Sequence, residues 1–275
     1  MPEPPFLSVV GVSKSLTSAD GRVLPVNRDV TLTVRPGEFV SIVGPSGAGK
    51  TTLLRTVGGL TTPDSGTVRH RGEPTKGVPS WLSMVFQEYN KTLFPWLSVR
   101  KNVRLAVRDI PKAAADLRVD QALAQVGLAG FASHYPWELS GGMQQRVALA
   151  RAMASQPELL LMDEPFASVD ALTRAKLEDM VLDLWQRAGF AAILVTHDIG
   201  EAVYLSDRVL ALSGRPSTIL SEVRVDLPRP RSQSVTRAMH RFHELSSQLL
   251  ALVEHAGQEE RERSGPGRAG AGDQP

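Results

Sequence analysis

Residues 44–51 read GPSGAGKT and directly follow the apolar run FVSIV at residues 39–43. The pattern G-x-x-x-x-G-K-[ST] is typical of a loop whose glycines let backbone N–H groups point at phosphate oxygens. A helix that begins near Lys50 would add the positive end of its dipole to the same site. The sequence therefore predicts a buried strand, a phosphate-binding loop and a helix, as in an α/β fold with a largely parallel sheet.

The residue types of this loop have separate predicted tasks. The Lys50 ammonium would pair with the β- and γ-phosphates of a nucleotide, and the Thr51 hydroxyl would ligate Mg²⁺. A glycine-rich turn without function is the alternative, and the strand before the loop and the helix after it argue against that alternative. The residues expected to bind the nucleotide here are Gly44, Pro45, Ser46, Gly47, Ala48, Gly49, Lys50, Thr51 and Thr52.

Two further apolar runs end in polar residues. The run LLLM at residues 159–162 is followed by Asp163 and Glu164, and the run AAILV at residues 191–195 leads to His197. Open α/β sheets bind ligands at the carboxyl ends of their strands. We therefore expect Asp163 to hold Mg²⁺ through water and Glu164 to polarise the attacking water. His197 would hydrogen-bond a γ-phosphate or that water.

The composition excludes several kinds of chemistry. The 275 residues include 31 Lys and Arg, 29 Asp and Glu, and no cysteine. A disulfide framework, a thiol nucleophile, a thiolate zinc site and an iron–sulfur cluster are therefore excluded. The near balance of charge gives no argument for nucleic-acid binding. No uncharged stretch is long and apolar enough to suggest a membrane span, so we expect a soluble, intracellular chain.

The segment LSGGMQQR at residues 139–146 decides between a kinase, a GTPase and a transport ATPase. It resembles the LSGGQ-type signature of ABC-family ATPases, and six motifs follow that family's order over about residues 7–227. The resemblance implies a P-loop NTPase fold of the ABC ATPase type. That fold has a RecA-like core, an antiparallel β subdomain and a helical subdomain. The resemblance also implies ATP as substrate and Mg²⁺ as cofactor.

The resemblance assigns roles at the interface of two copies of the chain. It implies that the signature binds the γ-phosphate held by the opposite subunit, so that two nucleotides lie in a head-to-tail homodimer. Gln87 is similar to the family's loop glutamine, which reaches Mg²⁺ and the attacking water. Asp170 is similar to the residue that touches the partner subunit, and His197 to the switch histidine. The signature residues are Ser140, Gly141, Gly142 and Gln144.

Near the N-terminus the sequence departs from the family pattern. Members of the family usually place an aromatic residue there to stack on adenine, and Leu16 stands at that position. A leucine offers apolar contact to the base without π-stacking. We therefore expect Leu16 to contact the base, with the preference for ATP over GTP left open.

The segment LFPWLSVRKNV at residues 93–103 resembles one found in ATPases for nitrate, sulfonate and taurine uptake. Residues 173–174, 201–208 and 213–216 are similar to the same group. The resemblance implies an importer subunit peripheral to the cytoplasmic face of the cell membrane. Its partners would be permease subunits, which dock on residues 93–103, and a periplasmic or lipoprotein solute-binding protein. The alternative is a soluble ABC ATPase that acts on nucleic acid or ribosomes.

The expected domain organisation follows from these motifs. Residues 7–230 would form the ATPase domain, with the helical subdomain inserted at about residues 88–155. Residues 231–256 would form an amphipathic helix, because apolar residues recur there at three- and four-residue steps. Residues 257–275 contain no Val, Ile, Leu, Met, Phe, Trp or Tyr, so we expect that tail to be disordered.

Overall fold

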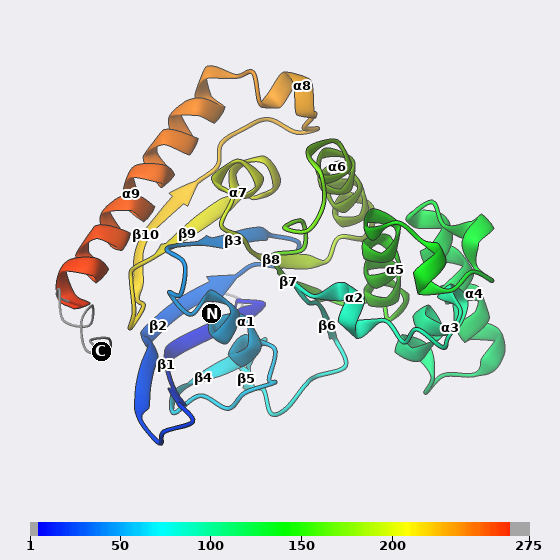
Figure 1. The fold of residues 1–275 in the computed structure, drawn as a ribbon, viewed down its shortest axis with the longest axis horizontal. Coiled ribbons are helices and arrows are strands. Elements are labelled where there is room, and N and C mark those ends of the chain that lie inside the picture. Colours follow the sequence, from blue (N-terminus) through cyan, green and yellow to red (C-terminus); the bar gives the residue numbers. More distant parts are fainter. Residues whose placement is uncertain (1–4, 265–275) are drawn as a thin grey trace, which may run out of the picture.

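A computed structural model describes residues 5–264 of the chain, and its centre is a six-stranded sheet (Figure 1). The strand order is β10-β9-β3-β8-β7-β6, in which β10 alone is antiparallel to its neighbour. The carboxyl ends of the five parallel strands therefore meet at one edge. The strands are β3 (Phe39–Val43), β6 (Leu82–Val85), β7 (Leu159–Asp163), β8 (Ala191–Val195), β9 (Arg208–Leu212) and β10 (Ile219–Arg224).

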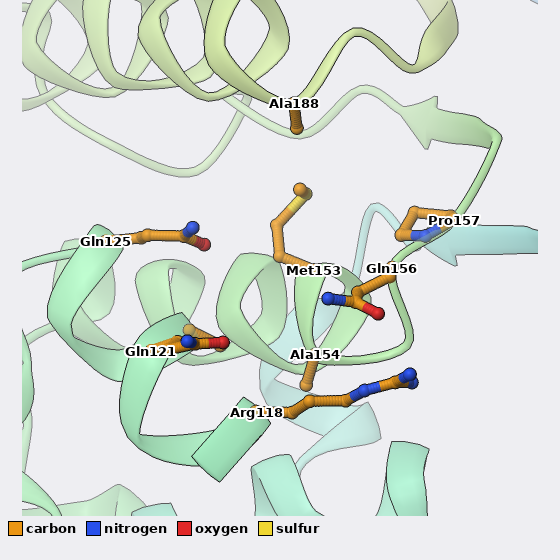
Figure 2. Close-up of a pocket in the computed structure, with 9 residues that line it drawn as sticks. Arg118, Gln121, Gln125, Met153, Ala154, Gln156, Pro157 and Ala188 are labelled. Atoms are coloured by element: carbon orange, nitrogen blue, oxygen red, sulfur yellow. The ribbon is translucent and has the colours of Figure 1, made fainter. Parts of the chain in front are cut away.

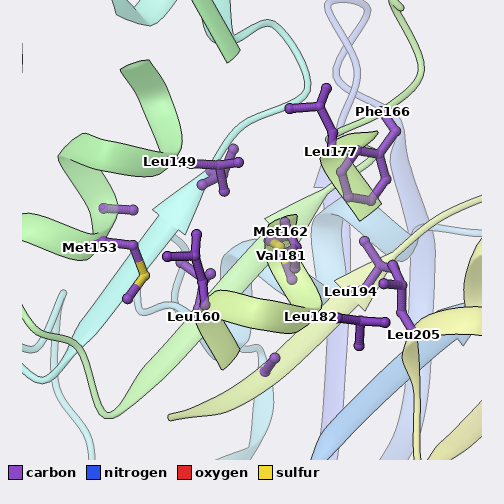
Figure 3. Packing of buried hydrophobic residues seen from close by; sticks show 14 of the residues in the cluster. Leu149, Met153, Leu160, Met162, Phe166, Leu177, Val181, Leu182, Leu194 and Leu205 are labelled. Atoms are coloured by element: carbon purple, nitrogen blue, oxygen red, sulfur yellow. The ribbon is translucent and has the colours of Figure 1, made fainter. Parts of the chain in front are cut away.

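The central strands β3, β7 and β8 are buried along their whole length. Successive side chains in a strand point to opposite faces, and the core divides in that way. Leu160, Met162 and Leu194 pack on one face against helical residues such as Leu149 and Val181 (Figure 3). Continuous apolar runs are thus required here, because helices or a second sheet cover each face.

The other face of the central sheet packs against helix α1 (Lys50–Val57) and a second, antiparallel sheet. That sheet has the order β2-β1-β4-β5. Its apolar side chains alternate inward along β1 and β2 and share a core with α1. The strands are β1 (Leu7–Thr17), β2 (Val23–Val34), β4 (Ser65–His70) and β5 (Glu73–Pro74).

A helical lobe is inserted between β6 and β7, on the right in Figure 1. Asn102 is fully buried in it, and its amide nitrogen donates to the carbonyls of Phe94, Leu97 and Ser98. This amide fixes the turn that precedes helix α3. The lobe comprises α2 (Tyr89–Thr92), α3 (Val99–Arg104), η1 (Leu105–Val107), α4 (Lys112–Gln125), η2 (Ala129–Phe131), η3 (Pro136–Glu138) and α5 (Gly141–Ala154).

Two helices complete the core beside α5. Helix α6 (Ala171–Ala188) is capped at its N-terminus by Asp170, whose carboxylate accepts hydrogen bonds from two backbone N–H groups of the first turn. Helix α7 (Ile199–Leu205) is capped in the same manner by Asp198. Both caps lie in loops at the carboxyl-end edge of the sheet, so each helix start is close to the predicted site.

The C-terminal segment differs from the sequence expectation. A short helix, α8 (Gln233–Thr236), precedes α9 (His240–Ser264), which runs past residue 256 into the segment expected to be disordered. The expectation was wrong for residues 257–264, because a helix needs no apolar residue of its own when Gln, Glu and Arg favour it. His255 and Glu259 also pair across one turn at 3.3 Å. Residues 265–275 lie outside the described residues.

Candidate nucleotide-binding and hydrolysis site

The loop between β3 and α1 has the predicted conformation. Gly47 and Gly49 have φ angles of 81° and 89°, in the region that favours glycine. A Cβ atom on Gly49 would lie 2.3 Å from a methyl carbon of Val26, so a side chain there has no room. The Lys50 ammonium donates to the carbonyls of Gly44 and Pro45, each at 2.9 Å. The loop therefore wraps around a buried cation.

The first strand-end carboxylate, Asp163, lies beside the loop. The Thr51 hydroxyl donates to Asp163 Oδ1 at 2.9 Å. Burial raises the pKa of Asp163, and the Thr51 hydrogen bond opposes that rise. Burial also lowers the pKa of Lys50, while Glu164 and Asp163 oppose that change. The structure thus brings a hydroxyl, a carboxylate and an ammonium together from two strand ends.

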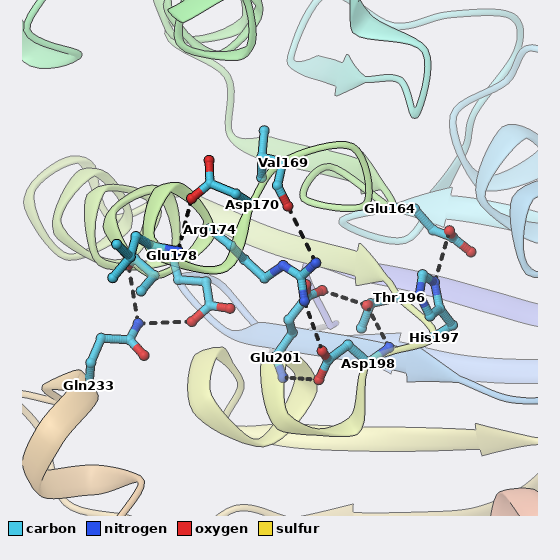
Figure 4. A network of polar contacts seen from close by, with 12 residues as sticks. Glu164, Val169, Asp170, Arg174, Glu178, Thr196, His197, Asp198, Glu201 and Gln233 are labelled. Carbon is cyan, nitrogen blue, oxygen red and sulfur yellow. Dashed lines mark hydrogen bonds and ion pairs between the residues drawn. The ribbon is translucent and has the colours of Figure 1, made fainter. Parts of the chain in front are cut away.

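The second carboxylate, Glu164, joins two side chains from other strand ends. Its Oε2 atom lies 3.0 Å from His197 Nδ1 (Figure 4). The same oxygen accepts from the Gln87 amide nitrogen at 3.3 Å. Glu164 has a φ angle of 43°, which is rare for a residue with a side chain. These three residues line an open cavity of about 570 Å³ together with Lys50, Thr51 and other residues of the phosphate-binding loop.

The predicted signature residues lie elsewhere, at the start of α5. The Ser140 hydroxyl accepts from the Met143 backbone N–H at 3.4 Å and caps the helix. A Cβ atom on Gly142 would lie 2.5 Å from Thr173 Cγ2, so a larger residue there would displace the Thr173 side chain. The Gln144 amide donates to the carbonyls of Pro136 and Leu139, which makes its visible role the closure of the preceding turn.

None of the four signature residues lines the cavity around Lys50 in the same chain. Leu16 is exposed on β1 opposite Leu24, and it is also absent from that lining. Asp170 lies at the start of α6, and its hydrogen bonds to the backbone and side chain of Thr173 lower its pKa. The roles of the signature, Leu16 and Asp170 therefore stay predictions.

One residue of the cavity was missed as a site residue by the sequence reasoning. Arg215, in the loop after β9, donates to the Gly47 carbonyl from Nη2 at 2.6 Å and from Nε at 3.1 Å. It lines the same cavity as Lys50. Strand β9 is the parallel neighbour of β3, so its C-terminal loop must reach the same sheet edge. A prediction of β9 as a core strand would have found Arg215.

A second cavity, of about 260 Å³, lies between α4, α5 and the end of α6 (Figure 2). Its polar groups come from Arg118, Gln121, Gln125 and Gln156, and Met153 lies in its wall. It contains none of the residues predicted to bind a nucleotide. The candidate site is therefore the cavity around Lys50.

The comparison with protein families agrees with this geometry. The sequence model of the family described as ABC transporter matches residues 27–167. The chain belongs to the ABC transporter ATPase family. The predicted family is therefore confirmed, and within residues 5–264 of this ABC chain no helix is long and apolar enough to cross a membrane.

Individual relatives cover most of this ABC ATPase. It is 50% identical over 231 residues to the aliphatic sulfonates import ATP-binding protein of Xanthomonas axonopodis pv. citri. The matched region covers 83% of this chain and 90% of the relative. It is 38% identical over 265 residues to the nitrate import ATP-binding protein of Synechocystis sp., with 93% and 98% covered.

A solved structure of an ATP-binding cassette, dimeric and bound to ADP and Pi in a post-hydrolysis state, is also similar. The TM-score is 0.70 at 31% identity, over 80% of this chain and 98% of that one. The predicted fold class is thereby confirmed. The central sheet with α1 corresponds to the expected core, and the antiparallel sheet and the helical lobe to the two expected subdomains.

A buried glutamate behind His197 gives this ABC ATPase a testable pH dependence of stability. Burial raises the pKa of Glu201 from 4.5 to about 7. The negative charges of Asp198 and Glu178 add to this rise, whereas the hydrogen bond from Thr196 and the positive charge of Arg174 oppose it. The folded chain therefore favours the neutral carboxyl. The free energy of unfolding that this group contributes is present below about pH 4.5 and is lost as the pH rises through about 7.

We expect Glu201→Gln to remove this contribution, because an amide does not ionise. The free energy of unfolding of the variant, relative to the wild type, should rise between pH 5 and pH 8 by up to about 3 kcal/mol. Urea unfolding of both chains at the two pH values measures the difference. Glu254→Gln, at an exposed position of α9, is the control. An equal difference at both pH values would contradict the assignment.

Proposed function

We propose that this chain is the ATP-hydrolysing subunit of an importer for nitrate, sulfonate, taurine or a related small solute. The observation that supports hydrolysis is the convergence of Glu164, His197 and Gln87 on a cavity that also contains Lys50. The support for import is the similarity to two import ATP-binding proteins, for aliphatic sulfonates and for nitrate.

In the proposed reaction the phosphate-binding loop holds ATP and the strand-end residues act on water. The Lys50 ammonium offsets phosphate charge, and backbone N–H groups of residues 46–52 donate hydrogen bonds to the phosphate oxygens. Glu164 accepts a proton from the attacking water, and its carboxylate lies 3.0 Å from His197 Nδ1. His197 then hydrogen-bonds the water or the γ-phosphate, and Gln87 orients the same water.

The oxygen donors beside Lys50 fit Mg²⁺, which prefers carboxylate, hydroxyl and water ligands. The Thr51 hydroxyl and the Asp163 carboxylate lie 2.9 Å apart, and the Gln87 amide is at the same cavity. Thr51 and Gln87 would hold the ion directly, and Asp163 through water. Bound Mg²⁺ would supply positive charge against the β- and γ-phosphates.

Homodimer formation is part of the proposal. The cavity around Lys50 contains no signature residue of its own chain, while Ser140, Gly141 and Gly142 begin a helix whose N–H groups suit an anion. A second copy, arranged head to tail, would place these groups on the bound γ-phosphate. The dimeric state of the similar ADP-bound cassette supports this arrangement. Asp170 would lie at the same interface.

The proposed coupling to transport passes through Gln87 to the helical lobe. ATP binding would close the homodimer and pull the helical lobes inward. The docked permease subunits would then change the side of the membrane from which their solute pathway is accessible, and hydrolysis would reopen the dimer. An apolar groove of about 340 Å³ lies between the core and the helical lobe, and its lining includes Phe86, Phe94 and Leu105. Trp96 stands exposed beside it, with its ring 5.3 Å from that of Phe94.

This groove is the proposed docking site for a cytoplasmic helix of the permease. Docking would hold the chain at the cytoplasmic face of the cell membrane, in a complex with a periplasmic or lipoprotein solute-binding protein. An exposed apolar groove on a lobe of this kind is typical of a protein interface. Residues 93–103, singled out from the sequence, supply Phe94 and Trp96.

We expect Trp96→Ala to lower recovery of the permease at least tenfold when the tagged chain is purified from native membranes, because the exposed anchor is lost. ATP turnover of the isolated subunit should change less than twofold. Trp137→Ala is a matched control, since Trp137 is 64% exposed on the same lobe and Trp96 is 68% exposed. Recovery of ribosomes or nucleic acid in place of a membrane protein would favour the soluble alternative and contradict the importer proposal.

A further inference from the structure

The loop that contains His197 is held on both sides of the histidine. His197 itself is 64% exposed. Before it, the Thr196 hydroxyl donates to Glu201 Oε2 at 2.6 Å. After it, the Asp198 backbone N–H donates to the Thr196 hydroxyl at 3.0 Å, and the Asp198 carboxylate accepts from the Glu201 N–H at 3.0 Å (Figure 4). The position of His197 therefore depends on groups that lie behind it.

The Arg174 guanidinium connects this loop to the loop before α6. Its Nη1 atom lies 3.4 Å from Asp198 Oδ2, and its Nε atom lies 3.6 Å from Glu201 Oε1. Its Nη2 atom lies 3.5 Å from the carbonyl oxygen of Val169, the residue before Asp170 (Figure 4). One planar group thus contacts both the loop proposed to touch the partner subunit and the residues that hold His197.

We propose that Arg174 is a positioning residue that couples the Val169–Asp170 loop to His197. When the partner subunit moves that loop, Arg174 shifts Asp198 and Glu201, and His197 moves relative to Glu164. The proposal rests on the roles of Asp170 and His197 given under Proposed function. It adds the physical connection between them, which the nucleotide contacts alone do not supply.

The contact lengths suit a connection that tightens on dimer closure. Charge-assisted N–H···O bonds are usually 2.7–2.9 Å long, so all three Arg174 contacts are long. Within residues 5–264, Arg174 Nε is buried and has no hydrogen-bond partner. A loop movement of less than about 1 Å would turn its 3.6 Å contact with Glu201 into a hydrogen bond.

The chemistry of the cluster requires an arginine. Glu201 is only 5% exposed, and a buried carboxylate needs a partner when it ionises. A guanidinium has five donors in a fixed plane and serves three acceptors at once, whereas an ammonium is a point charge on a flexible stem. Lysine at this position would retain the charge beside Glu201 and lose the simultaneous contact with Val169.

The test is a double-mutant cycle on ATP turnover in the full chain. We expect Arg174→Gln to lower kcat about tenfold and to leave KM for ATP within about twofold, because the nucleotide contacts stay intact. If Arg174 acts through His197, adding Arg174→Gln to His197→Ala should lower kcat no further. Arg174→Lys is a second variant should Arg174→Gln fail to fold, and it should show the same non-additivity.

Arg187→Gln is the matched control, because Arg187 is an exposed cation near the end of α6 that pairs only with Asp183 among the described ion pairs. Its kcat should equal that of the wild type. Wild-type kcat in both Arg174 variants would overturn the coupling. So would a double variant whose fold-loss of kcat equals the product of the losses in the Arg174 variant and in His197→Ala. Unchanged turnover in His197→Ala alone would instead show that the proposed role of His197 is wrong, and the coupling would fall with it.

Discussion

Replacement of Glu164 by glutamine is expected to lower ATP turnover by about 10²–10⁴-fold. Glutamine has nearly the same shape and retains an oxygen for the hydrogen bond from Gln87. It does not accept a proton from water at neutral pH. ATP affinity should stay within about twofold of the wild type, because Lys50 and the phosphate-binding loop are unchanged.

The same variant should accumulate as an ATP-bound dimer, because the closed state persists when hydrolysis is blocked. Phosphate release measures turnover, and gel filtration with and without ATP measures dimer formation. Glu222→Gln is the control, since Glu222 lies on the surface and pairs with Arg208 away from the cavity. Normal turnover by Glu164→Gln would remove Glu164 from its proposed role.

Replacement of Lys50 by alanine is expected to weaken ATP binding about a hundredfold or more. The change removes the one ammonium that the loop encloses and leaves the carbonyls of Gly44 and Pro45 without that donor. The triphosphate would then meet two carbonyl oxygens in place of a cation. Calorimetric titration with ATP measures the affinity.

Lys112→Ala, at the exposed first residue of α4, is the control for loss of a surface cation. The thermal unfolding midpoint of Lys50→Ala separates lost binding from lost folding. Wild-type ATP affinity in a folded Lys50→Ala chain would contradict the assignment of the loop.

Much of the site could be predicted from the sequence because its residues stand next to strong local patterns. GPSGAGKT after an apolar run indicates both a strand and a phosphate site, and the strand-end position of Glu164 and His197 follows from parallel topology. The structure places their side chains 3.0 Å apart. Sequence spacing alone did not give that distance.

The parts that escaped prediction depend on contacts between distant segments. Arg215 reaches Gly47 only because β9 pairs with β3, and Arg174 reaches Asp198 only because α6 and α7 begin side by side at one sheet edge. The helix over residues 257–264 lacks the apolar spacing that marks amphipathic helices. Its charged residues favour helix by intrinsic propensity, which the apolar pattern does not report.

In the proposed homodimer, each nucleotide site is shared between two copies of the chain. Lys50→Ala removes the cation of the phosphate-binding loop, and Ser140→Arg places a large side chain at the start of the signature helix. Each variant alone should be inactive. A head-to-tail dimer of one copy of each would still pair the intact loop of one chain with the intact signature of the other.

The decisive measurement is therefore the ATPase activity of an equimolar mixture of Lys50→Ala and Ser140→Arg chains. Half of randomly formed dimers are mixed, and each mixed dimer has one intact site of two, so activity should recover to about a quarter of the wild-type value. A mixture no more active than the two variants measured separately would contradict the shared site.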